Sequence, residues 1–193
     1  MSTTDIYGFV YRGELAQEAL DSVGRRSRPG HEDDSASLDR SLSIDILPEM
    51  YLPRASRMAR IFIAISVLEN SVRDLIEKAL LEELGAEWWT EAVSSSIRSK
   101  VESRINEEQK RRFHTQRGGR NLDYIDFGDL SKIIIAKWEV FEDVINTDQE
   151  WCKNVFSSIG QTRNVIMHGG EVDEHDVHRV GMAIRDWAKQ VGV

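Results

Sequence analysis

The chain has 193 residues, of which 40% are hydrophobic and 30% are charged, the ordinary balance of one globular domain with its own core. No unbroken apolar run approaches the roughly 20 residues that a bilayer-spanning helix needs, and no basic stretch followed by an apolar one suggests a secretory signal. Cys152 is the only cysteine, which excludes an intrachain disulfide and a cysteine-based metal cage. We therefore expect a cytoplasmic protein that does not enter the membrane.

The formal net charge of −8 arises from 33 acidic and 25 basic residues. An acidic chain is a poor non-specific ligand for nucleic acid, because phosphate binding depends on clustered lysine and arginine. Any contact with nucleic acid must therefore come from a local basic cluster.

The positions of the prolines indicate the fold class. All three prolines lie within the first 53 residues, and the 140 residues that follow contain none, which favours long uninterrupted helices. No segment shows the alternation of a strand over more than a few residues. We predict an all-α protein, with a short N-terminal helix (residues 13–23) and a mobile linker (residues 24–45) within residues 1–50, and a helical bundle over residues 51–193.

The first long helix is predicted to begin after Pro53 and to end at Gly85, a residue suited to a left-handed C-cap. Its apolar residues alternate spacings of three and four and form one stripe: Met58, Ile61, Ile65, Leu68, Val72, Leu75 and Ala79. A second, more polar helix is predicted over residues 87–113, with one apolar face formed by Trp88, Val93, Ile97, Val101 and Ile105.

Three further helices are predicted after the basic segment that follows residue 109. Asp126 or Asp129 could cap the first of them, whose buried face would be Phe127, Leu130, Ile134, Trp138 and Phe141. Residues 147–150 form a capping-box sequence that opens the next helix, which runs to His168 and stops at Gly169-Gly170. Asp173 caps the last helix. The expected fold is an antiparallel bundle of four to five long helices.

The candidate catalytic residues lie on the last two turns of the helix that ends at Gly169. At about 100° per residue, Asn164 and His168 lie one above the other, and Arg163 is about a quarter turn away. Arginine binds phosphate with a planar fork, and histidine can take a proton from a 2′-hydroxyl or give one to a leaving oxygen. Asparagine can orient the imidazole or donate to a phosphate oxygen. These residue types suit cleavage of a phosphodiester.

A structural interpretation of the same three residues is ordinary helix capping. A cation near a helix C-terminus interacts favourably with the helix dipole and bonds the last carbonyl groups. Spacing alone does not separate this interpretation from the catalytic one.

A basic run is the candidate RNA contact: Lys110, Arg111, Arg112, Arg117 and Arg120, with His114 among them and no acidic residue within the run. The alternative is an exposed interhelical loop with solvated charges.

His175 and His178 could share a helix face and hold a metal with a carboxylate, but acidic residues and surface histidines are also common at a helix start. We expect no metal and no cofactor. Cys152 and His168 would be separated by about 24 Å of helix, too far for a nucleophile and its base within one chain.

Three stretches of the sequence, in this order, resemble the HEPN superfamily. Leu68-Glu69-Asn70 and the segment from Leu84 to Trp89 look like the opening helix and tryptophan turn of one HEPN branch, named for a nuclear RNA-quality-control endonuclease. The segment from Tyr124 to Leu130, continuing to Trp138, is similar to the branch's "dYldFGDL…W" segment, and Arg163-Asn164-x-x-x-His168 resembles the R-x-x-x-x-H signature.

The resemblance implies a helical domain that dimerises and so brings two arginine–histidine motifs together. Many HEPN members are metal-independent endoribonucleases, often toxins or phage-defence effectors. By this resemblance His168 is the acid–base residue, Arg163 the phosphate and transition-state ligand, and Asn164 a positioning residue. The expected partners are a second copy, an RNA substrate, and as a further candidate an antitoxin or regulatory protein. The rival hypothesis is a catalytically silent HEPN dimerisation or sensing module that acts through a protein or nucleotide partner. A purely structural helical protein is the third option.

Overall fold

The computed structural model describes residues 31–111 and 113–191. The chain divides into two compact units, Met1–Leu52 and Pro53–Val193, which are treated separately below. Every element of regular structure in the described residues is a helix, which confirms the all-α prediction. No helix in this part of the chain is long and apolar enough to span a membrane.

The described part of the first unit contains helix α2 (His31–Ser41) and two short 3₁₀ helices, η1 (Ile44–Ile46) and η2 (Glu49–Tyr51). Helix α2 corrects the predicted linker over residues 24–45, whose middle is helical. No glycine or proline interrupts residues 31–41, and Arg40 in the last turn complements the helix dipole. The helix predicted over residues 13–23 lies outside the described residues.

The second unit is built on helix α3 (Leu52–Leu84), which ends where predicted, at a Gly85 with a φ of 68°. Its apolar stripe is buried as expected, with one exception. Leu75 is only half-buried, and Ile76 is fully buried instead. The stripe shifts by one residue because an α-helix of this length drifts around its own axis relative to a fixed pattern of threes and fours.

The single helix predicted over residues 87–113 is wrong, because the structure breaks it in two. A 3₁₀ turn, η3 (Gly85–Glu87), leads into α4 (Trp88–Ala92), and α5 (Ser95–Lys110) begins after an extended Val93. Ser94 is the N-cap of α5, and its hydroxyl accepts a hydrogen bond from the Ile97 N–H at 3.4 Å. Val93 and Ile97 are both buried, as expected for the apolar face of this segment.

After the basic segment, η4 (Asn121–Tyr124) precedes α6 (Phe127–Ala136), with Asp126 at the N-cap position, one of the two predicted caps. The predicted continuation of this helix to Phe141 is interrupted at Lys137, whose backbone leaves the helical region, so that Trp138–Phe141 form a separate turn, α7. Phe127, Leu130, Ile134 and Phe141 are buried as expected, and Trp138 is half-buried.

Two helices complete the unit, α8 (Gln149–Met167) and α9 (Glu174–Val191). The predicted capping box at residues 147–150 is off by one position: the side chain of Asp148, not Thr147, accepts the Trp151 N–H at 2.7 Å. The predicted cap at Asp173 is confirmed, since its side chain accepts the Asp176 N–H at 2.8 Å.

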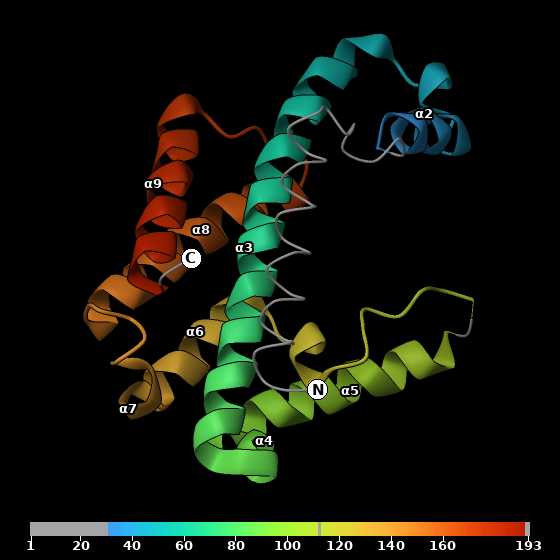
Figure 1. The fold of residues 1–193 in the computed structure, drawn as a ribbon. Helices are drawn as coiled ribbons and strands as arrows, with labels where there is room; N and C mark the ends of the chain where they lie inside the picture. The colour runs from blue at the N-terminus through green and yellow to red at the C-terminus, as the bar shows by residue number, and fades with distance from the viewer. Residues whose placement is uncertain (1–30, 112, 192–193) are drawn as a thin grey trace, which may run out of the picture. The chain divides into compact units, whose positions relative to one another are not determined.

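Helices α6, α8 and α9 pack around an aromatic cluster. Phe127 and Phe156 stack with ring centres 4.9 Å apart, and Phe156 meets Trp187 edge-on at 5.5 Å. A short loop joins α8 to α9, so these two helices run antiparallel. Within the unit, α3 runs alongside them as the longest helix (Figure 1). A cavity of about 250 Å³ lies between α3 and α9. Figure 1 shows both helices running from the top of the view to the bottom, in roughly the same direction.

Candidate active site

The end of helix α8 has a fully formed Schellman motif. Gly169 adopts a φ of 71°, the Gly169 N–H donates to the Ile166 carbonyl at 3.0 Å, and the Gly170 N–H donates to the Val165 carbonyl at 2.8 Å. His168 is the C-cap residue, and its N–H donates to the Asn164 carbonyl at 3.1 Å. The backbone that carries Asn164 and His168 is therefore held in one defined conformation.

The two glycines of this end are needed for different reasons. At Gly169 a side chain would meet no atom within 4 Å, but the positive φ disfavours any residue with a Cβ. At Gly170 an added Cβ would lie 2.6 Å from Val165 Cγ1 and 2.8 Å from the Val165 carbonyl oxygen. The Gly-Gly pair thus combines a conformational requirement with a steric one.

The loop that follows His168 is tied to the first turns of α3. Arg54 donates to the Gly169 carbonyl at 2.8 Å, and Arg57 donates to the Val172 carbonyl at 3.0 Å. Both arginines also lie 3.6 Å from the carboxylate of Glu171. Contacts from two arginines to two carbonyls and one carboxylate fix the position of this loop, and with it the end of α8.

Arg163 does not extend into solvent but turns toward α3. Its Nε lies 3.2 Å from Oε2 of Glu69, a carboxylate whose side chain is only 8% exposed. Arg163 itself keeps 31% of its side-chain surface exposed. Because the contact uses Nε, the terminal nitrogens Nη1 and Nη2 remain outside this bond and can address a phosphate group.

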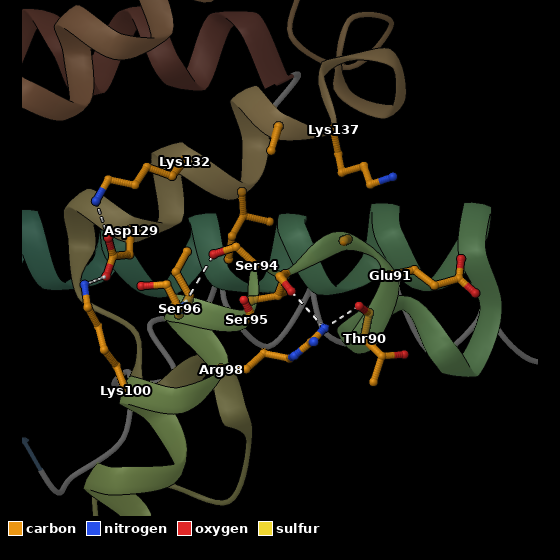
Figure 2. A pocket seen from close by; sticks show the side chains of 15 residues that line it. Thr90, Glu91, Ser94, Ser95, Ser96, Arg98, Lys100, Asp129, Lys132 and Lys137 are labelled. Carbon is orange, nitrogen blue, oxygen red and sulfur yellow. Dashed lines mark hydrogen bonds and ion pairs between the residues drawn. The ribbon is translucent and has the colours of Figure 1, made fainter.

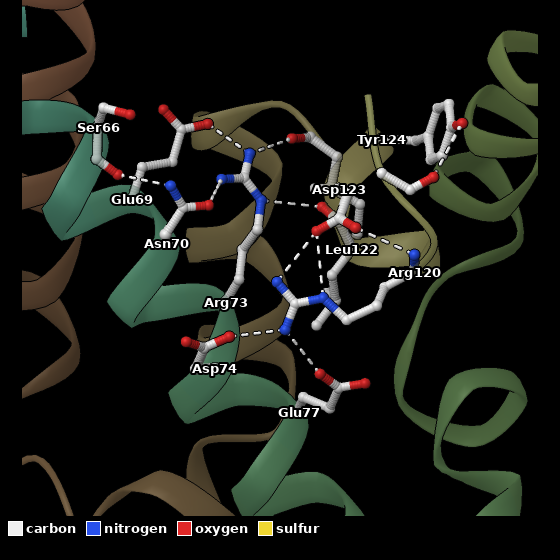
Figure 3. Close-up of polar contacts among 12 residues, drawn as sticks. Ser66, Glu69, Asn70, Arg73, Asp74, Glu77, Arg120, Leu122, Asp123 and Tyr124 are labelled. Atoms are coloured by element: carbon white, nitrogen blue, oxygen red, sulfur yellow. Dashed lines mark hydrogen bonds and ion pairs between the residues drawn. The ribbon is translucent and has the colours of Figure 1, made fainter. Parts of the chain in front are cut away.

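Glu69 is shared between two arginines. Its Oε1 accepts from Arg73 Nη2 at 2.5 Å, one turn further along α3. Arg73 is itself buried and donates from Nε to the Leu122 carbonyl at 3.0 Å (Figure 3). One carboxylate thus pairs with two guanidinium groups. The cluster of Glu69, Arg73 and Arg163 therefore has a net charge of +1, and Arg163 is the member that reaches the surface.

The three predicted catalytic residues therefore lie in two settings. Asn164 and His168 are both exposed and lie one turn apart on α8, as predicted from spacing. Arg163 is half-buried and oriented by Glu69 rather than turned back toward His168. The arrangement presents an imidazole, an amide and an oriented guanidinium on the last two turns of a fixed helix, which is suited to binding and protonating a phosphodiester.

The predicted RNA-binding run does not form one uniform basic surface. Lys110 ends α5 and Arg111 is its C-cap, and both side chains are exposed. Arg112 lies outside the described residues. Arg117 is paired with Glu108, Nε to Oε1 at 2.9 Å. The charge available for RNA therefore lies mainly at the end of α5.

Arg120 has a role that the sequence pattern did not indicate. Its guanidinium contacts the carboxylates of Asp74, Glu77 and Asp123 at 2.6, 2.9 and 3.0 Å (Figure 3). The hydrogen bond with Asp74 is the largest cause of the raised pKa of Arg120, followed by that with Asp123. With three carboxylates around it, Arg120 joins α3 to η4 and has no net positive charge to offer RNA.

The positioning pair Glu69 and Arg73 was not predicted as part of the site. A signal for it is present in the sequence: the two opposite charges are four residues apart and fall on the edge of the apolar stripe, among Ile65, Val72 and Ile76. Charges in such positions are rarely buried unless they are paired. What the pattern does not contain is the third member, Arg163, which is 94 residues away in the chain.

The histidines of α9 and the single cysteine are not arranged for chemistry. The His178 ring nitrogen Nδ1 lies 2.8 Å from the Glu174 carbonyl of its own helix. In the described part of the chain, no three His, Cys, Asp or Glu side chains are grouped closely enough to hold a metal ion. Cys152 is fully buried, and burial raises the pKa of its thiol to about 12.

We expect Cys152 to be inert toward a thiol reagent such as DTNB at pH 8 and to react only after unfolding. The same burial makes the free energy of unfolding fall between about pH 9 and pH 12, because the unfolded thiol ionises near its ordinary pKa while the folded thiol stays protonated. Denaturant titrations of the wild type and of Cys152→Ala across this range measure the effect. Equal pH dependence of the two proteins would contradict it.

The all-α fold agrees with the fold that the resemblance of the three stretches implied. A family model described as Swt1-like HEPN matches residues 64–192, about two thirds of the chain. The chain therefore belongs to the Swt1-like HEPN family, whose namesake is an RNA-quality-control endonuclease. HEPN domains are often ribonucleases. No curated protein and no solved structure matches the chain.

Proposed function

We propose that the protein is a metal-independent endoribonuclease that cleaves RNA at a composite site in a homodimer. The observation that carries this proposal is the placement of Arg163. A buried carboxylate, already paired with Arg73, holds its guanidinium at the surface of the same helix end that carries the exposed Asn164 and His168. Helix capping alone does not require that a buried ion pair hold an arginine near the helix end.

The chemistry follows from the residue types. His168 takes the proton of a ribose 2′-hydroxyl, the oxygen attacks the adjacent phosphorus, and the bond from phosphorus to the 5′-oxygen breaks. Arg163 stabilises the extra negative charge on the phosphoryl oxygens, and Asn164 orients the imidazole or donates to one of those oxygens. The leaving 5′-oxygen receives a proton. The products are a 2′,3′-cyclic phosphate and a 5′-hydroxyl.

One histidine cannot be both base and acid in a single step, so a second copy of the chain is proposed to supply the other. Apolar side chains next to the motif suit such an interface: Val165 and Met167 on α8 are 40% and 56% exposed. On the stretch of α3 between the loop anchors and Glu69, Phe62 and Ile63 are exposed as well. Exposed apolar residues grouped around a polar site are typical of interaction surfaces.

Lys110 and Arg111, at the end of α5, are proposed as additional contacts to the RNA backbone. Binding by such residues falls steeply with salt, because it depends on release of counterions from the phosphates. A toxin or defence role in the cytoplasm follows from the same family resemblance, with an antitoxin or regulatory protein as the partner that restrains the enzyme.

The decisive experiment is incubation of the wild type and of His168→Ala with mixed single-stranded RNA in EDTA, followed by mapping of the cleaved ends. We expect cyclic-phosphate ends from the wild type and a loss of at least about a hundredfold in rate from His168→Ala and Arg163→Ala. Lys153→Gln, an exposed change elsewhere on α8, is the matched control. Equal cleavage by the wild type and His168→Ala, or none by a folded dimeric wild type, would favour the silent module.

Mixing of subunits tests the composite site. If each active dimer needs both copies of His168, equal amounts of wild type and His168→Ala that exchange at random should retain about one quarter of the activity. Retention of about three quarters would show that one histidine per dimer is enough, and about one half would show that each protomer acts independently.

A further inference from the structure

A polar cavity of about 720 Å³ lies between α4, α5 and α6 (Figure 2). Its volume is in the range of small-molecule sites, roughly 300–1,000 Å³. It is separate from the candidate active site. Helix α4 follows the end of α3 at Leu84, which is about 22 Å along that helix from Glu69.

The cavity is positively charged although the chain is acidic. Four cationic side chains line it, from the start of α5 and from α6 and its end: Arg98, Lys100, Lys132 and Lys137. Only two carboxylates, those of Glu91 and Asp129, line it as well. Figure 2 shows the Glu91 side chain directed away from Lys100 and Lys132. The side chains of the lining therefore have a net charge of +2 in a chain whose net charge is −8, and Lys137 also lies 3.8 Å from Glu139, which is outside the lining.

Asp129 organises two of these cations. Its carboxylate is buried and accepts from Lys132 Nζ at 2.6 Å and from Lys100 Nζ at 3.1 Å (Figure 2). Burial alone would raise the pKa of Asp129, but the two lysines outweigh it and the pKa lies below its usual value. One carboxylate thus holds two ammonium groups at the cavity, where the second positive charge is not compensated by Asp129.

The remaining lining groups indicate which ligand fits. Hydroxyl side chains of Ser95 and Ser96 line the cavity and can donate to oxyanions, whereas the Thr90 hydroxyl in the same lining donates to the Glu87 carbonyl at 2.9 Å. Among the described residues, none that lines this cavity is aromatic, so the lining itself has no ring on which a nucleobase could stack. The chemistry matches a compact, multiply charged phosphate group and provides no recognition of a base.

We infer that this cavity binds a compact oligophosphate, either free or as the phosphate end of a larger ligand. Ammonium groups bind phosphate as point charges, so several of them around one concave site favour an anion with more than one negative charge. The inference is independent of RNA cleavage, since none of the cavity residues belongs to the candidate active site.

Isothermal titration of the full chain with tripolyphosphate at low salt tests the site. We expect binding that weakens at least about tenfold in the double variant Lys132→Gln/Lys137→Gln and about threefold or more in each single variant. ATP should bind within about threefold of tripolyphosphate, and adenosine should not bind. The control is Lys153→Gln/Lys189→Gln, which removes the same charge from α8 and α9 and should leave binding unchanged.

Three results would overturn the inference. The first is no binding of tripolyphosphate by the folded wild type. The second is an equal loss in the control variant, which would indicate a diffuse charge effect. The third is binding of single-stranded RNA that depends on Lys132 and Lys137 without binding of tripolyphosphate, which would make the cavity an RNA contact. A variant with Ser96→Glu places a negative charge in the cavity without removing a lysine and should also abolish binding, which guards against loss of fold in the lysine variants.

Discussion

Replacement of Glu69 by alanine is expected to destabilise the second unit by about 3–5 kcal/mol, because it leaves the buried guanidinium of Arg73 without its carboxylate. Arg73→Ala should cost a similar amount, since it removes the partner of Glu69 and the donors to the Leu122 and Ile125 carbonyls. Chemical denaturation of each variant measures the change. The matched control is Glu82→Ala, an exposed residue on the same helix, which should change stability by less than about 0.5 kcal/mol.

Arg163→Ala separates the contribution of the Glu69–Arg73–Arg163 cluster to stability from its proposed contribution to RNA cleavage. It removes only the half-exposed cation, and Glu69 keeps its bond to Arg73, so the stability loss should stay near about 1 kcal/mol or below. RNA cleavage, in contrast, should be lost in Arg163→Ala. A large stability loss in Arg163→Ala with a small one in Glu69→Ala would contradict this assignment.

Glu69→Gln tests positioning in a protein that remains folded at low temperature. Glutamine keeps the shape and one acceptor oxygen but removes the charge that holds Arg163. On the proposed function, kcat should fall more than KM rises, because Arg163 would still be present but less well oriented. An unchanged kcat would limit Glu69 to a structural role.

Alanine at Gly170 is expected to destabilise the second unit by about 1–3 kcal/mol, because the new methyl group would overlap Val165 Cγ1 and the Val165 carbonyl oxygen. The bond from the Gly170 N–H to that carbonyl would have to lengthen, which moves the C-cap residue His168. Thermal unfolding measures the stability, and cleavage by the protein that is still folded reports the displacement of the imidazole.

Three glycine variants serve as controls for this prediction. Gly119→Ala meets no atom within 4 Å and has an ordinary φ, so it should be nearly neutral. Gly169→Ala meets no atom either but must adopt a positive φ, at a cost of about 1–2 kcal/mol. Gly169→Asn should cost less than alanine, because asparagine tolerates the left-handed region. If Gly119→Ala and Gly170→Ala cost the same, the steric explanation is wrong.

Helix ends with local signals were predictable from the sequence. Gly85, Asp173 and Gly169 each end or begin a helix through their own backbone preference or a side chain that bonds two or three residues away. The helix breaks at Val93 and Lys137 were not predictable in the same way. Both follow from how the flanking segments pack into the core, and no glycine or proline marks them.

The candidate site shows the same division between local and long-range information. Helical spacing placed Asn164 and His168 on one face correctly, because that relation spans a single turn. Glu69 as the partner of Arg163, and Asp74 and Glu77 as partners of Arg120, could not be inferred, since each lies more than 40 residues away in the chain. Asp123, the third partner of Arg120, is only three residues away. A run of basic residues in the sequence does not show which of them form ion pairs with acidic residues in the folded chain.

The contacts of Arg54 and Arg57 indicate that the structural domain around the arginine–histidine motif begins before the family match does. The family match starts at residue 64, yet the loop behind His168 is held by side chains that precede this point by up to ten residues. Met58, which accepts a hydrogen bond from the Val172 N–H at 3.4 Å, also precedes it. A fragment cut at the family boundary would keep every residue of the arginine–histidine motif and still lose the anchors that hold its histidine in place. The domain defined by sequence similarity therefore starts too late to include all the residues that hold the motif in place.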